Sequence, residues 1–117
     1  MNLPNKFNTC IVIVTYNPDS NFVNNLMQHL EIVEKVIIVD NNSEVNIESI
    51  MPNEYLNRID IIHSDINMGI AWALNTGIKK AIKLAFKWIL TFDQDSFPNI
   101  NLLQHYFCVF QKEIQDF

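Results

Sequence analysis

Two carboxylates, Asp93 and Asp95, directly follow an apolar run and are separated by one residue. If the backbone is still extended there, both side chains lie on one face and can serve a single cation with its attached phosphates. Hard carboxylate oxygens suit magnesium or manganese. The alternative is that Asp95 or Ser96 only caps a following helix. The D-x-D spacing alone leaves both interpretations open.

The other apolar runs of the sequence also end in polar or acidic residues. These are Thr15, Tyr16 and Asn17 after the first run, Asp40, Asn41, Asn42 and Ser43 after the second, and Ser64, Asp65 and Asn67 after the third. In a parallel sheet the carboxyl ends of the strands meet at one edge, so the four aspartates that follow the runs are expected to share a rim. They are Asp40, Asp65, Asp93 and Asp95. Because like charges need a cation or hydrogen-bond donors nearby, a bound divalent metal is the simplest prediction for this rim.

Two further features of this edge suit a nucleotide. The ring of Tyr16 can stack on a planar base, although a tyrosine that anchors the edge of the sheet is nearly as good an interpretation. The segment Asn67-Met68-Gly69 places a turn and free backbone N–H groups before a helix, which suits a diphosphate. An ordinary glycine-assisted turn explains the segment equally well. Within that helix, Gly77 is expected to permit close packing and Asn75 to point towards the site.

The elements that must position these residues alternate between strand and helix. Two apolar, β-branched runs, at residues 10–16 and 35–40, predict strands buried within a parallel sheet, and the runs at 59–63 and 88–92 predict a third and a fourth strand. Helical periodicity predicts helices from about residue 20 to 30, from Gly69 to about Lys87 and from Asn101 to Gln115, with a weakly indicated short helix at 45–51. This order predicts an α/β fold, a mostly parallel sheet with helices on both faces, in a Rossmann-like arrangement. Residues 1–117 are expected to form one unit.

The composition excludes several classes of protein. A chain of 117 residues with 49% hydrophobic residues is expected to fold, and a net charge of −5 without a basic arm excludes a non-specific nucleic-acid binder. We expect no signal peptide and no transmembrane segment, because the apolar runs are too short. Cys10 and Cys108 read as buried free thiols, which suits the cytoplasm, with at most a peripheral position at the inner face of the membrane. The histidines, His29, His63 and His105, are expected to be packing or surface residues.

Four motifs in order resemble glycosyltransferase family 2. They are Ile13–Asn17, Val36–Ser43, Asn67–Ala71 followed by Ala73, Asn75 and Gly77, and Trp88–Ser96. The second and fourth are most similar to bacterial rhamnosyltransferases. The resemblance implies the nucleotide-binding half of a GT-A fold, in an inverting hexosyltransferase. The implied donor is dTDP-rhamnose, with a UDP-sugar next, and the implied acceptor is a cell-surface polysaccharide or a lipid-linked saccharide.

The resemblance also assigns roles to individual positions. It implies that Thr15, Tyr16 and Asn17 line the base pocket and that Asp40 bonds the base, with Asn42 and Ser43 in the same loop. Asn67, Gly69 and Asn75 are implied to lie beside the nucleotide. The ribose, the metal (magnesium or manganese) and the diphosphate are implied to be held by Asp93, Gln94 and Asp95. The metal ligands among these are Asp93 and Asp95. Where the family often has a second carboxylate, this sequence has Asn41, as rhamnosyltransferase-like members do.

The family's catalytic base lies in a C-terminal half, so the resemblance places it beyond residue 117. We therefore expect no catalytic residue in this chain, no activity of the chain alone, and self-association through the strand edge at 88–92. One alternative is a non-catalytic sugar-nucleotide-binding module or a subunit completed by another chain. A receiver-type phosphoacceptor domain is a further alternative, but the first strand ends in Thr15-Tyr16-Asn17 rather than in acidic residues, and no fifth strand with a lysine is present.

Overall fold

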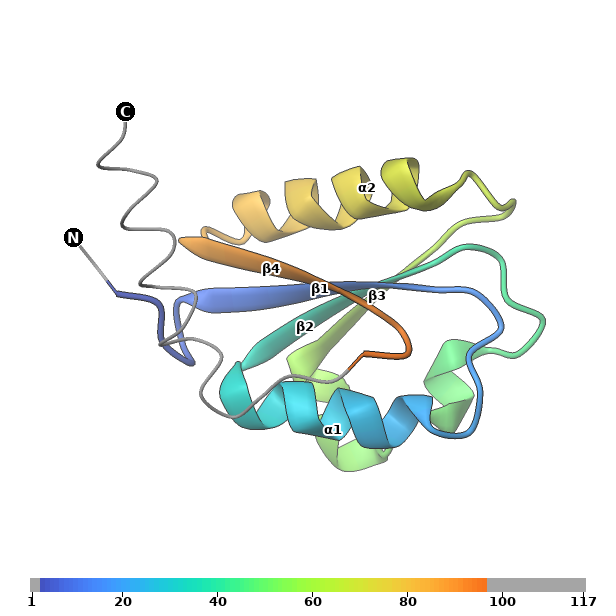
Figure 1. Ribbon diagram of the computed structural model, residues 1–117, viewed down its shortest axis with the longest axis horizontal. Helices are drawn as coiled ribbons and strands as arrows, with labels where there is room; N and C mark the ends of the chain where they lie inside the picture. Colours follow the sequence, from blue (N-terminus) through green and yellow to red (C-terminus); the bar gives the residue numbers. More distant parts are fainter. Residues whose placement is uncertain (1–2, 97–117) are drawn as a thin grey trace.

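The computed structural model describes residues 3–96, which form four strands, two α-helices and two 3₁₀ helices (Figure 1). The strands are β1 (Thr9–Thr15), β2 (Lys35–Asp40), β3 (Ile59–His63) and β4 (Trp88–Asp93). The α-helices are α1 (Phe22–Ile32) and α2 (Ile70–Lys83), and the 3₁₀ helices are η1 (Ile47–Ile50) and η2 (Asn53–Arg58). The helix predicted from Asn101 to Gln115, with His105 and Cys108, lies outside the described residues.

The four strands form one parallel sheet in the order β3-β2-β1-β4, which confirms the predicted fold class. From β1 the chain steps through β2 to β3 on one side, and β4 then returns to the other side of β1. The direction of the connections therefore reverses between β1 and β4. In open α/β sheets such a switch point opens a crevice beyond the carboxyl ends of the strands.

Helix α2 lies on one face of the sheet, and α1 with the two 3₁₀ helices lies on the other (Figure 1). Each face carries its own hydrophobic core. One core joins alternate residues of the strands to α1, η1 and η2, and the other joins the remaining alternate residues to α2. In β1, for example, Ile11 and Ile13 face α1, whereas Cys10 and Val12 face α2. Because both faces are covered, the central strands read as continuous apolar runs, and this is why they were recognisable in the sequence.

Helix α2 packs against the sheet at Gly77. A Cβ atom added there lies 2.3 Å from Val12 Cγ1 and 3.2 Å from Val39 Cγ2. These distances are closer than ordinary van der Waals contact, so only glycine allows this approach of the helix to β1 and β2. The predicted role of Gly77 is confirmed.

The end of α2 differs from the prediction. The helix ends at Lys83 rather than near Lys87, because Ala85 adopts a left-handed conformation with φ of 68°. The amide of Phe86 then donates to Ala81 O at 3.2 Å, which closes the helix end. Phe86 still packs into the α2-side core. Because Phe86 is apolar and fits the helical periodicity, the sequence predicted a helix longer than the one observed.

Within residues 3–96, β4 forms one edge of the sheet and β3 the other. Self-association through β4 stays a prediction. In the same part of the chain, no helix is long and apolar enough to cross a membrane.

Candidate functional site

The side chain of Asp40 joins the ends of β1 and β2. Its carboxylate accepts hydrogen bonds from Thr15 Oγ1 at 2.7 Å, from Ser43 Oγ at 2.5 Å and from Ser43 N at 2.9 Å. Thr15 and Asp40 are register partners on neighbouring strands, and both are buried. An ionised carboxylate offers about four acceptor positions, so Asp40 retains about one for a ligand. The two bonds from Ser43 to the Asp40 carboxylate hold the loop after β2 in place.

The loop after β1 is fastened to the same network through Asn17. The amide of Asn17 donates to Ser43 Oγ at 2.8 Å, and Asn17 Oδ1 accepts from Glu44 N at 2.9 Å. Asn17 and Asn42 have φ of 45° and 66°, a region that asparagine tolerates better than most residues. Asn17 and Asn42, both predicted site residues, therefore also shape the loops after β1 and β2.

A polar cavity of ≈ 360 Å³ lies between the loop after β2 and the loop after β3. Its lining includes Asp40, Asn42 and Ser43 from the first loop and His63, Ser64 and Asp65 from the second. Two of the four predicted rim carboxylates thus share one cavity. His63 is a surface residue, as expected, and its Nε2 lies 2.5 Å from Glu48 Oε1.

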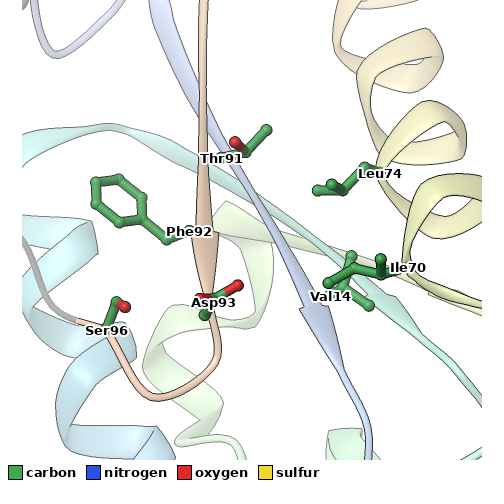
Figure 2. Close-up of a pocket in the computed structure, with 7 residues that line it drawn as sticks. All are labelled: Val14, Ile70, Leu74, Thr91, Phe92, Asp93 and Ser96. Atoms are coloured by element: carbon green, nitrogen blue, oxygen red, sulfur yellow. The ribbon is translucent and has the colours of Figure 1, made fainter.

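A second cavity, of ≈ 240 Å³, lies at the switch point between β1 and β4 (Figure 2). Ile70 and Leu74 of α2 form one wall, and Val14 of β1 lies with them (Figure 2). Asp93 and Ser96 supply the polar groups at the end of β4. The first carboxylate of the D-x-D motif therefore opens into the crevice in which α/β folds bind ligands.

The second carboxylate of the motif lies elsewhere. After Asp93 the chain turns, and the amide of Ser96 donates to Asp93 O at 3.1 Å. Asp95 consequently lines a third cavity, on the α1 side, with Asp19 and the asparagines that begin α1. The extended geometry on which the shared-cation argument was based is not met. Among residues 3–96, no group of three or more acidic, histidine or cysteine side chains is placed to hold a metal ion.

Gln94, between the two carboxylates, faces back towards the loop after β1. Its Oε1 accepts from Tyr16 N at 2.8 Å, and its Nε2 donates to Tyr16 O at 3.2 Å. This pair of bonds continues the β1–β4 ladder beyond the last register pair, Val14 with Asp93. Tyr16 is 51% exposed, and base stacking requires an exposed ring.

The turn before α2 differs in part from the prediction. Gly69 has φ of 86°, so the turn does need glycine. However, the amide of Gly69 donates to Asn67 Oδ1 at 2.9 Å, and that of Met68 to Asn41 Oδ1 at 3.3 Å. Neither N–H group is free for an anion. If a diphosphate binds at this helix end, it must accept hydrogen bonds from the backbone amides of the turn that begins at Ile70. Asn75 is exposed on α2 and lines none of the three cavities described above.

The profile of glycosyl transferase family 2 matches residues 10–113, which is most of the sequence and includes the four strands and the D-x-D turn. The chain belongs to glycosyltransferase family 2. Among known proteins, dTDP-rhamnosyl transferase RfbF of Shigella flexneri is 33% identical over 90 residues, which are 76% of this chain and 30% of that protein. This chain therefore spans less than a third of the length of that relative.

Within this family 2 domain, sequence reasoning missed the residues that hold the D-x-D turn. His29 is 1% exposed on α1, its Nε2 lies 3.1 Å from Ser96 O, and its ring packs 4.7 Å from that of Phe92. Burial lowers the pKa of His29 to about 4, so the ring is neutral. In the described part of the chain its Nδ1 has no hydrogen-bond partner. His29 shares an apolar face with Phe22 and Leu26, which was the available signal.

Asn41 is a second residue at this edge of the sheet whose contacts the sequence analysis did not predict. It is 3% exposed, and its amide bridges from the end of β2 to the start of α2. Its Nδ2 donates to Gly69 O at 3.2 Å, while its Oδ1 accepts from Met68 N. An aspartate lacks the donor that the first of these bonds needs. The amide at this position is therefore suited to fixing the turn before α2.

Proposed function

We propose that this chain forms the donor-binding half of an inverting glycosyltransferase, with dTDP-rhamnose as the donor and a cell-surface polysaccharide or lipid-linked saccharide as the acceptor. The observation that carries the proposal is the crevice at the β1–β4 switch point, into which Asp93 opens. Family membership and the similarity to a dTDP-rhamnosyl transferase support the reaction class and the donor. The catalytic base stays an expectation from the family resemblance, and we assign it to no described residue.

In this proposal the nucleotide base occupies the side of the site formed by the loops after β1 and β2. The exposed ring of Tyr16 stacks on the base, and the remaining acceptor position of Asp40 is available to an N–H group of the base. The polar cavity beside Asp40 gives the base and ribose a place lined by hydrogen-bonding groups. The diphosphate then extends towards Asp93 at the end of β4.

The donor set fits a divalent ion only together with the nucleotide. Asp93 and Asp95 supply hard oxygens, but two carboxylates on either side of a turn are too few for the octahedral shell that magnesium demands. Diphosphate oxygens and water must complete the shell. Because Asp95 lines a different cavity from Asp93, we propose that the two bind one magnesium or manganese ion only when the diphosphate is present and the turn at 93–96 brings Asp95 towards Asp93. When bound, the ion neutralises the charge of the departing diphosphate.

Isothermal calorimetry of the 117-residue chain tests the proposal, with dTDP, UDP and GDP each titrated with and without manganese. We expect dTDP to bind most tightly and to need the metal, and we expect Asp93→Asn to abolish the metal dependence. Glu31→Gln is the matched control, because it also removes one negative charge but lies in the last turn of α1, away from the carboxyl ends of the strands. A folded chain that binds none of the three nucleotides would refute the assignment.

A further inference from the structure

The middle residue of the D-x-D motif makes a contact that the two carboxylates do not. The carboxamide of Gln94 pairs with both backbone groups of Tyr16, accepting at 2.8 Å and donating at 3.2 Å. A carboxamide is suited to this pairing because it carries one acceptor and one donor at the same end of the side chain. Glutamate has no donor for Tyr16 O, and asparagine is one methylene shorter.

The loop after β1 is held from two sides. Thr15 and Asn17 bond towards the loop after β2, through Asp40 and Ser43, whereas Tyr16 between them bonds towards the β4 turn through Gln94. Tyr16 is therefore the residue at which the two halves of the edge meet. The direction of its exposed ring depends on a backbone that Gln94 holds.

The turn that carries Gln94 is itself held from the side of α1. Gln94 O accepts from Asn25 Nδ2 at 3.5 Å, and Ser96 O lies 3.1 Å from His29 Nε2. With its backbone fixed in this way, the turn gives the Gln94 side chain a rigid base from which to reach Tyr16. The same turn begins with Asp93, at the mouth of the switch-point crevice.

We propose that Gln94 is a positioning residue that couples the two ends of the donor site, by holding the Tyr16 backbone at a fixed place relative to Asp93. This inference rests on the proposed function. Gln94 acts on the base through Tyr16 and makes no contact of its own with the nucleotide. Its loss weakens ligands that carry a base and leaves the binding of a metal–diphosphate unit unchanged.

The test compares dTDP with inorganic pyrophosphate, each titrated calorimetrically into the chain with manganese. Gln94→Met removes both hydrogen bonds at constant charge and similar length, and we expect it to weaken dTDP about tenfold, the equivalent of one or two hydrogen bonds, while pyrophosphate affinity is unchanged. Gln28→Met is the matched control, because Gln28 is exposed on α1. Thermal unfolding by circular dichroism confirms that both variants are folded.

A double-mutant cycle separates positioning from direct contact. Tyr16→Ala alone is expected to weaken dTDP about ten- to a hundredfold by loss of stacking. If Gln94 acts through Tyr16, adding Gln94→Met to Tyr16→Ala causes no further loss. Additive effects, or an equal loss of pyrophosphate affinity in Gln94→Met, would overturn the inference. Failure of the unaltered chain to bind dTDP would instead refute the proposed function, so the two failures are distinguishable.

Discussion

Replacing Gly77 by alanine tests whether α2 is as close to the sheet as the structure indicates. The added Cβ would lie 2.3 Å from Val12 Cγ1, and ordinary contact begins at 3.4 Å. Val12 is fully buried on a central strand, and a β-branched side chain has little rotamer freedom with which to yield. The helix must therefore move outward by about 1 Å, or the strands must deform.

The magnitude follows from two opposing effects. Overpacking of this kind costs about 1–3 kcal/mol, and the severity of the clash favours the upper part of that range. Alanine is a better helix former than glycine by about 1 kcal/mol, which offsets part of the loss. We expect the free energy of unfolding to fall by about 1–2 kcal/mol, which lowers the melting temperature by roughly 4–8 °C.

Urea unfolding followed by circular dichroism measures this change. Asn75→Ala is the control on the same helix: Asn75 is exposed, so the substitution should raise the stability by a few tenths of a kcal/mol. Val12→Ala should restore space for the new methyl group, so the double variant should be more stable than the sum of the single changes by about 1 kcal/mol or more. A Gly77→Ala chain as stable as the original, or strictly additive changes, would refute the close packing.

Three further changes test the buried polar groups. Burial lowers the pKa of His29 to about 4, below its usual value in an unfolded chain, so its contribution to stability is complete above pH 6.5 and is lost as the pH falls towards 4. In denaturant titrations, His29→Gln should remove about 3 kcal/mol of this pH dependence. An unchanged dependence of the unfolding free energy on pH would contradict this. Burial raises the pKa of the Cys10 thiol to about 12. In a Cys108→Ser chain, whose one thiol is Cys10, iodoacetamide at pH 8 should therefore react about a thousandfold more slowly than it does with free cysteine, and urea should abolish this protection. Asn41→Asp places a buried charge beside Gly69 O and should lower stability at pH 7 by about 2–3 kcal/mol, with partial recovery at acid pH, as thermal melts would detect.

The sheet was predictable because its two central strands, β1 and β2, are buried on both faces. Runs such as Cys10–Val14 and Val36–Val39 are apolar at every position, and the alternation with helices left a parallel sheet as the expected arrangement. The end of α2 was not predictable in the same way. Phe86 belongs to the core from a non-helical backbone, so its apolar character extended the pattern past the true helix end.

The position of the candidate site at one edge of the sheet was predictable, but the contacts of the turn at 93–96 were not. Parallel strands bring their carboxyl ends to one edge, which explains why Asp40, Asp65 and Asp93 were placed there correctly. The turn at 93–96 depends on contacts from α1, through His29 and Asn25, that are distant in the sequence. Local spacing therefore could not reveal that Asp95 leaves the face on which Asp93 lies.

The alternation of side chains also sets a length for the ligand. Asp40 faces the α1 side of the sheet, with Thr15, whereas Asp93 faces the α2 side, and β1 separates their strands. Two strand spacings amount to about 10 Å. A molecule that touches both carboxylates must cover this span and pass over the end of β1 from one face to the other. The strand order therefore favours an elongated ligand, with one end at the loop after β2, its middle over the end of β1 and its other end at the end of β4.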